Sequence, residues 1–386
     1  MSDDKEVAED YRQQRQESQA KKLGQEPRTR EQQLQWMDDN RKLILEFIRR
    51  VAGTLGDEDK ILAEYNHAVK MTSEGSQFDD VNARQILERV LKEVEQVCAV
   101  NKISFRGGVA FGVALGGGLN LSQRAVLKTE SSIIEATLPF LAFCNFVSKA
   151  VARTLPKVVK GGFVEVCNVP SEVGRALQSS PTLVAEWAAI IGAYAQGSSP
   201  RDVDIAMTDI PTLSIHVQIL RSIEIFAMAH EYGHHVFEHG IAKTSEETGD
   251  SFLEEHEADV FGRAVSMAVG EGERPPNQYA VSGAGAVVIL GALDLIRRAT
   301  AVLRTGIDSA VPRKRHPPFA DRIKFIASLD RQLPELQRGP AAIQRECFIQ
   351  IMELVWEAIL PEIRRRHAAG DRPLDEALDT GGWLPV

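Results

Sequence analysis

The stretch IEIFAMAHEYGHHVFEHG, Ile223 to Gly240, contains the pattern HEYGH between His230 and His234. Its apolar residues recur at the three- and four-residue spacing of a helix, and Pro211 upstream suits the first turn of that helix. Residues four positions apart lie on one helix face, so the imidazoles of His230 and His234 can bind the same metal ion. Glu231 is offset from this pair and can hold a metal-bound water without being a ligand. The stretch therefore predicts a helix that carries two metal ligands and a general base.

A second block, SFLEEHEADVFGRA, begins at Ser251. Ser251 and Glu254 form the S-x-x-E pattern of a capping box, which predicts that a new helix starts here. Because Glu254 is then engaged at the helix end, Glu255 is the better third ligand; it completes a His, His, Glu set with the fourth position open for water. Asp259 shares a helix face with Glu255 and is expected to accept the second ring N–H of a ligand histidine. Glu254, His256 and Asp259 remain rival third ligands.

Together, HEYGH and EHEAD resemble the HExxH…ExxAD signature of gluzincin metallopeptidases, and they are most similar to the HtpX and CAAX prenyl protease family and its soluble relatives. A third block, RKRHPPFADRIKFIASL from Arg313 to Leu329, is similar to that family's downstream HPP…R motif. The resemblance spans about Ile210 to Leu329. It implies that His316 and Arg322 lie near the metal and act on the substrate carbonyl or the oxyanion. The best-known family members are integral membrane proteins, and this chain departs from them in lacking convincing membrane spans.

The chemistry expected from this resemblance is zinc-dependent peptide hydrolysis. One zinc ion per chain, held by His230, His234 and Glu255, lowers the pKa of its water from about 15.7 towards about 7 and polarises a carbonyl. Glu231 takes the proton of this water and passes it to the leaving amine. The partner is expected to be a protein or peptide substrate, laid extended along a sheet edge such as the strand predicted at Val203–Ile210. A His, His, Glu set with an open position favours zinc over other divalent metals.

Several other functions fit the same residues. A regulated protease of narrow specificity, of the ImmA repressor-protease or Lit phage-exclusion type, also carries HExxH on a helix, and a housekeeping protease would use the same chemistry. A latent enzyme whose N-terminal arm covers the cleft is a further possibility. A non-catalytic scaffold protein with structural zinc would need a fourth protein ligand, such as His235, His256 or Asp259. Glu231 argues against the scaffold, since a structural site needs no base. His235 and His239 lie off the ligand face of the helix and are not expected to bind the metal.

The composition limits the class of protein. With 44% apolar and 26% charged residues, the chain has globular rather than disordered proportions. Its net charge of −9 argues against nucleic-acid binding through bulk positive charge. No signal-peptide pattern and no apolar run of about 20 residues is present, so a membrane partner is not expected. Scattered cysteines without a CxxC pattern suit a reducing cytoplasm, where we expect the protein to act; they are Cys98, Cys144, Cys167 and Cys347.

The patterns along the chain predict an α+β protein that is mostly α. Its expected centre is a zincin-like core, with an active-site helix, a following ligand helix and a small mixed sheet. Strands are predicted within 103–115 and 162–169, and a buried helix over 133–155. Four regions are expected: a disordered or loosely helical arm at 1–35, a helical N-terminal region at 36–100, the zinc metallopeptidase domain at 101–330 and a C-terminal helical extension at 331–386.

Overall fold

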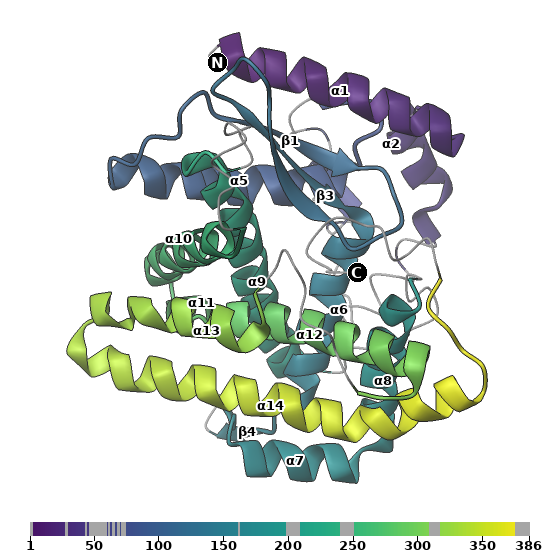
Figure 1. Cartoon of the computed structure of the whole chain (residues 1–386), viewed down its shortest axis with the longest axis vertical. Coiled ribbons are helices and arrows are strands. Elements are labelled where there is room, and N and C mark those ends of the chain that lie inside the picture. The colour runs from purple at the N-terminus through teal and green to yellow at the C-terminus, as the bar shows by residue number, and fades with distance from the viewer. Residues whose placement is uncertain are drawn as a thin grey trace.

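The computed structural model is mostly helical, with a small mixed sheet and a separate two-stranded ribbon (Figure 1), as the sequence predicts. It describes residues 3–27, 30–42, 75–160, 163–197, 209–239, 251–308 and 317–374, with a few single positions between 45 and 70. His316 and most of the helical pattern between 43 and 74 lie outside the described residues. The strand predicted at Val203–Ile210 also lies outside them up to Thr208, and Ile210 is instead the first residue of a helix.

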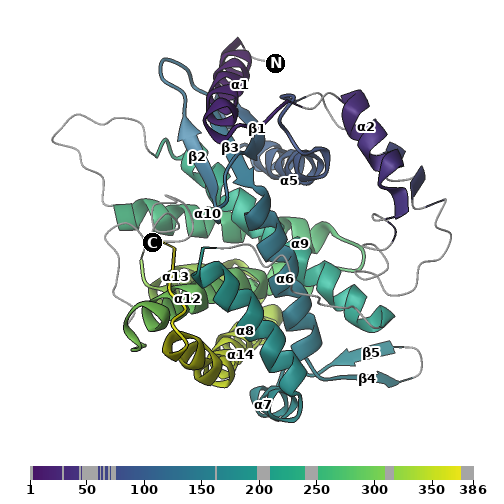
Figure 2. The same ribbon diagram turned by 90° about the vertical axis from the view of Figure 1, so that its right-hand side faces the viewer.

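The mixed sheet has the strand order β1-β3-β2, with β3 parallel to β1 and antiparallel to β2. β3 is therefore the central strand and is buried at every position, whereas β1 and β2 are edges (Figure 2). β1 was predicted within 103–115, but β2 was not, because its sequence LSQRA is mostly polar and partly exposed. The strands are β1 (Val109–Ala114), β2 (Leu121–Ala125) and β3 (Ser132–Thr137).

Helix α6 (Leu138–Thr154) follows β3 without a loop. The prediction of one helix over 133–155 is wrong for its first residues, which form β3. Pro139 lies in the first turn of α6, where its missing N–H costs no hydrogen bond, and it therefore marks a helix start. The β-branched Ile133 and Ile134 before it are well suited to a buried strand.

Helix α1 (Asp3–Leu23) packs against β1 and β3. Its Arg12 is fully buried and donates to both carboxylate oxygens of Asp79, at 3.0 and 2.9 Å. Gly112 in β1 makes room for this guanidinium, since a Cβ there would lie 1.9 Å from the Arg12 Nη1. The first part of the segment expected to be a disordered or loosely helical arm is thus a regular helix with a buried ion pair.

Helix α9 (Ile210–Val236) runs through the centre of the fold. Asp209 caps its start by accepting the N–H of Thr212, and Pro211 lies in the first turn as predicted. Five of the described helices and strand β2 pack against it, so every residue from Ser222 to Tyr232 is buried. The helices that contact it are α5 (Val81–Val100), α6, α10 (Ser251–Gly272), α12 (Ala284–Thr305) and the short α11 (Gln278–Ser282). The predicted helical patterns after Ala83 and from Ser251 are both confirmed.

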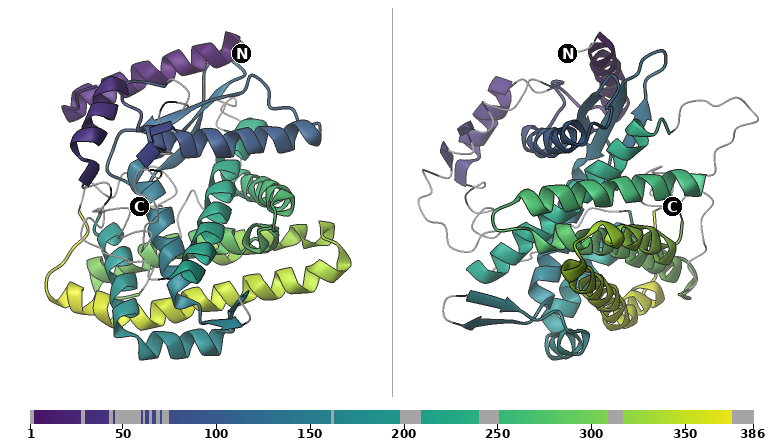
Figure 3. Two further views of the ribbon diagram at one scale, coloured as in Figure 1. Left: turned by 180° about the vertical axis from the view of Figure 1, so that it is seen from behind. Right: turned by 90° about the vertical axis from the view of Figure 1, so that its left-hand side faces the viewer.

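The chain after α10 forms a helical layer that packs against α9 through α11 and α12. Helices α12 and α14 lie side by side (Figures 1 and 3), and Phe348 and Trp356 of α14 belong to the same hydrophobic core as Leu87 of α5 and Phe226 of α9. The described part of the expected C-terminal extension therefore packs into the main body. The remaining elements are α2 (Arg30–Asp39), α7 (Pro170–Ser179), α8 (Pro181–Ala195), α13 (Phe319–Ser328), η1 (Leu329–Gln332), α14 (Glu335–Ala368) and the ribbon of β4 (Lys157–Lys160) and β5 (Phe163–Val166).

Two chain-wide features bear on the expectations from composition. All four cysteines are free thiols. Within the described ranges, no helix combines the length and the apolar character needed to cross a bilayer.

Candidate metal centre

The side chains of the two sequence blocks meet where α9 and α10 cross. His230 Nε2 and His234 Nε2 lie 3.2 Å apart. Glu255 on α10 approaches each of them at 3.6 Å, through Oε2 to His230 and Oε1 to His234. The helices can come this close because Gly233 and Ala258 face each other, and a Cβ on Gly233 would lie 3.2 Å from the Ala258 Cα. The three residues predicted as ligands are thus brought together.

The separations between these atoms suit a small divalent metal. Ligands at 2.0–2.1 Å from a tetrahedral zinc ion lie about 3.3 Å from one another, close to the 3.2 and 3.6 Å measured here. Among the residues that the structure describes, this is the one group of three or more His, Cys, Asp or Glu side chains whose ligand atoms converge in this way. The donor set, two imidazoles and a carboxylate, is typical of a catalytic zinc site.

Asp259 orients the first histidine. Its Oδ1 lies 3.0 Å from His230 Nδ1, and Arg322 donates to both of its oxygens, at 2.7 and 2.6 Å. Burial alone would raise the pKa of Asp259, but the Arg322 guanidinium more than offsets this and holds it below its ordinary value. The ionised carboxylate can only accept, so the proton of His230 is on Nδ1 and the Nε2 lone pair points into the cluster. This is the partner expected from the sequence for Asp259.

The two imidazoles differ in how readily they take up a proton. Burial and then the neighbouring His230 lower the pKa of His234 to about 3, so this ring is neutral at pH 7. Burial also lowers the pKa of His230, but its bond to Asp259 outweighs burial and raises the pKa, which makes the ring a stronger donor. Converging lone pairs in a buried site are stabilised by a shared cation, and the residues present therefore fit a metal ion.

Glu231 lies beside the cluster at the free edge of β2. It is buried, and the Gln123 N–H donates to its Oε2 at 2.6 Å. Gln123 is opposite Ile134 of β3, yet its N–H points away from β3. Backbone groups point alternately to the two sides of an antiparallel strand. The backbone N–H and C=O groups of Leu121 and Ala125 therefore also point outward at this edge. The strand next to the cluster in the described structure is therefore β2, which the sequence analysis missed.

The other candidate residues have different partners. Arg322 on α13 lies at the cluster, with Nη2 3.8 Å from Glu255 Oε2, but its hydrogen bonds go to Asp259. His235 lies 2.9 Å from both the Ser132 hydroxyl and the Phe105 carbonyl, and His256 stacks on Phe325 at a centroid distance of 3.6 Å. Of the possible fourth ligands His235, His256 and Asp259, none joins the converging group. No family model, curated protein or solved structure matches the chain.

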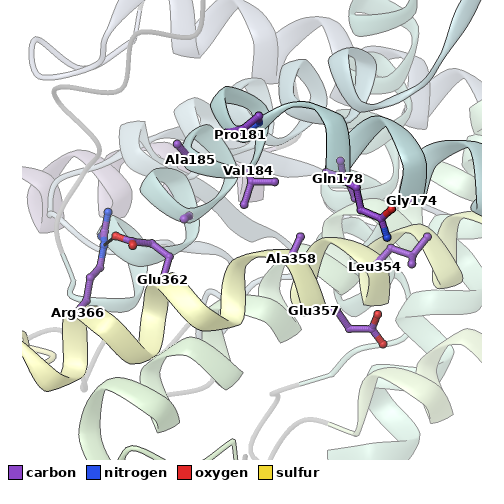
Figure 4. A pocket seen from close by; sticks show the side chains of 12 residues that line it. Gly174, Gln178, Pro181, Val184, Ala185, Leu354, Glu357, Ala358, Glu362 and Arg366 are labelled. Carbon is purple, nitrogen blue, oxygen red and sulfur yellow. Dashed lines mark hydrogen bonds and ion pairs between the residues drawn. The ribbon is translucent and has the colours of Figure 1, made fainter.

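A groove elsewhere on the molecule is separate from this centre. It has a volume of about 720 Å³ and lies between α7, α8 and α14 (Figure 4). Its lining is mostly apolar, and α14 contributes the charged residues Glu357, Glu362 and Arg366. Its lining residues include none from HEYGH or EHEAD. The candidate chemistry therefore belongs to the crossing of α9 and α10 and not to this groove.

Proposed function

We propose that the chain is a zinc-dependent endopeptidase with a zincin-like core. The observation that carries the proposal is the convergence of His230, His234 and Glu255 around one point, with the buried Glu231 beside it. The combination of an active-site helix, a second helix that brings the third ligand, and an adjacent edge strand supports it.

Each residue has a separate role in this proposal. His230, His234 and Glu255 would hold the zinc ion, which supplies Lewis-acid chemistry when bound by acidifying a water and polarising a carbonyl. Glu231 acts as the general base: the Gln123 N–H holds its carboxylate beside the cluster, where it accepts a proton and passes it to the leaving amine. Such a fixed carboxylate needs no rearrangement before proton transfer, which favours catalysis.

The edge of β2 supports a peptide as the substrate. The Gln123 N–H donates to Glu231, and an extended peptide can pair with the other outward-facing backbone groups of this edge as an added strand. Backbone pairing would hold the scissile bond in a defined register near the cluster without reading the substrate's side chains. A regulated protease of the ImmA or Lit type would use the same chemistry with a narrower substrate set.

A zinc scaffold is the weaker alternative. A structural zinc site normally has four protein ligands. The three candidates for that position in the described chain, His235, His256 and Asp259, are engaged with other partners. The buried carboxylate of Glu231 next to these residues would serve as the general base of an enzyme, whereas a structural zinc site needs no base.

The test compares cells that express the natural chain with cells that express Glu231→Gln, by proteome-wide profiling of protein N-termini. We expect new N-termini with the natural chain only, because the amide cannot accept the proton while zinc binding is kept. Glu271→Gln, the same change at an exposed position of the neighbouring helix α10, is the control and should behave as the natural chain. Equal zinc content with identical N-termini in both would contradict the protease and favour the scaffold.

A further inference from the structure

The second metal-binding histidine has an outer partner that the helical pattern does not predict. Helix α9 ends at Val236, and Glu238 adopts a left-handed backbone conformation with φ of 61°. This turn lets the His239 N–H donate to the His234 carbonyl at 2.9 Å. The His239 ring is thereby folded back against the helix end, where it is buried.

The buried ring connects His234 to α10. His239 Nδ1 lies 2.8 Å from His234 Nδ1, and His239 Nε2 lies 3.0 Å from Glu257 Oε2. Glu257 is half-exposed, with 48% of its side chain accessible, so its carboxylate is solvated on one side. The chain of contacts therefore runs from the candidate ligand through a buried imidazole to a carboxylate at the surface.

The chemistry of these groups fixes the positions of the protons. An ionised Glu257 can only accept, so His239 carries its proton on Nε2 and presents a lone pair at Nδ1. That lone pair accepts the Nδ1–H of His234. The remaining nitrogen of His234, Nε2, is then unprotonated and faces His230 and Glu255. Each proton position follows from the carboxylate at the end of the chain.

We propose that His239 and Glu257 are a positioning pair that fixes the tautomer and ring orientation of His234 for metal binding. The proposal rests on the proposed zinc site and assigns it a second orienting device. His230 is oriented by the buried Asp259–Arg322 ion pair, whereas His234 is oriented by the His239 imidazole, which reaches a solvated carboxylate. Both orienting carboxylates, Asp259 and Glu257, lie on α10.

Two substitutions at His239 separate its two hydrogen bonds. In His239→Asn the side-chain oxygen takes the place of Nδ1 and can still accept from His234, while the bond to Glu257 is lost. In His239→Gln the side-chain amide nitrogen takes the place of Nε2 and can still donate to Glu257, while the bond to His234 is lost. His239→Ala removes both bonds. If the ring had only a structural role, the Asn variant would not be expected to bind Zn²⁺ more tightly than the Gln variant.

The experiment measures Zn²⁺ affinity of the full chain by competition with a chromophoric chelator, together with the visible spectrum of the Co²⁺-loaded protein. Loss of an orienting partner typically costs 10- to 100-fold in metal affinity. We expect His239→Ala and His239→Gln to weaken Zn²⁺ binding by about 10- to 100-fold and to alter the Co²⁺ spectrum. His239→Asn should remain within a few-fold of the natural chain. His216→Ala, which removes another buried histidine on α9, is the control and should leave Zn²⁺ affinity unchanged.

The outcomes distinguish this inference from the proposed function. Equal Zn²⁺ affinity in all three His239 variants, or a loss in His239→Asn as large as in His239→Ala, would overturn the positioning pair and leave the metal site intact. A natural chain that binds Zn²⁺ no better than His230→Ala would overturn both. Circular dichroism and thermal melts of each variant ensure that affinity is compared between folded proteins.

Discussion

Asp259 is the residue on which the orientation of His230 and the burial of Arg322 both depend. It is fully buried and pairs with both, so its replacement affects stability and metal binding by different routes. Arg322→Met leaves the carboxylate without its counter-charge, and we expect a loss of about 3–5 kcal/mol in the free energy of unfolding. The double variant Asp259→Leu, Arg322→Met removes both charges and should recover most of that loss. Urea denaturation of the metal-free proteins measures both values.

Zinc affinity should not recover in the same double variant, because His230 still lacks its acceptor. We expect about a 10- to 100-fold weaker Kd for Zn²⁺. Full recovery of affinity together with stability would show that Asp259 has no orienting role.

Arg322→Lys tests whether Arg322 acts on the substrate carbonyl or the oxyanion, the role that the family resemblance implies. A fall in kcat with unchanged zinc affinity and unchanged stability would mean that Arg322 acts on the substrate directly.

The sequence predicts which side chains converge, but it predicts the outer partners of these side chains unevenly. His230, Glu231 and His234 follow from helix geometry alone, and Glu255 follows once a helix start at Ser251 is recognised. His239 could not be found in this way, because five-residue spacing on a continuing helix points away from His234. The contact exists only because α9 ends at Val236 and the chain turns through a left-handed residue.

At the scale of elements, the close crossing of α9 and α10 determines how far Glu255 lies from the histidine pair. A Cβ on Gly262 of α10 would lie 3.0 Å from the Phe226 carbonyl oxygen and 3.2 Å from the His230 nitrogen, both backbone atoms. Gly to Ala in a helix interior normally stabilises by about 0.5–1 kcal/mol. At this position we expect the opposite, a loss of about 1–3 kcal/mol from overpacking.

Gly272 of the same helix provides the matched control, since a Cβ there meets nothing within 4 Å. Gly272→Ala should leave both the melting temperature and Zn²⁺ affinity unchanged or slightly improved. Gly262→Ala should lower both, because separating the helices moves Glu255 away from His230 and His234. If Gly262→Ala melts like the natural chain and binds zinc normally, the crossing is not the feature that sets the site.

Local pattern fails at the elements whose structure depends on pairing or packing with another element. Strand β2 has a mostly polar sequence, and it is a strand because it pairs with the buried β3 that follows it. Ile133 and Ile134 of β3 fit a strand or a helix equally well by hydrophobicity, so the pattern extends the predicted helix over them. Helix α1 lacks large apolar residues, which predicts a loose arm, yet it docks through the buried Arg12, whose partner Asp79 lies 67 residues away in the sequence.

At the scale of the whole molecule, three of the four regions expected from the sequence, 36–100, 101–330 and 331–386, contribute to one hydrophobic core. Buried residues of α5, α6, α9, α12 and α14 form a continuous cluster. The shared core becomes visible only in the packing of helices that are distant in sequence. No change of composition along the chain indicates which regions contribute to it. We therefore expect the described body from α5 to α14 to unfold cooperatively. A change at one buried group on α9 should then alter the free energy of unfolding of this whole body.

Two buried groups on α9 give that stability opposite pH dependences. Burial raises the pKa of Glu224 to about 7, against the opposing charges of Arg89 and Arg221. Burial lowers the pKa of His216 to about 4, with Lys149 acting in the same direction. The folded chain thus holds the Glu224 proton more tightly, and the His216 proton less tightly, than the unfolded chain. The Glu224 contribution is lost as pH rises towards about 7, and the His216 contribution is lost as pH falls towards about 4.

Glu224→Gln isolates the first of these effects. The amide keeps the shape of the protonated acid, and the lost ion pair involves an Arg89 side chain that is 53% exposed, so it is worth little. We expect the variant to match the natural chain near pH 4.5 and to be more stable at pH 8. The advantage should grow by on the order of 1 kcal/mol per pH unit between pH 4.5 and about 7, and then level off. Urea denaturation across this range measures it. A constant difference between the two proteins would mean that Glu224 is already ionised in the folded state at low pH, held by Arg89 and Arg221 despite its burial.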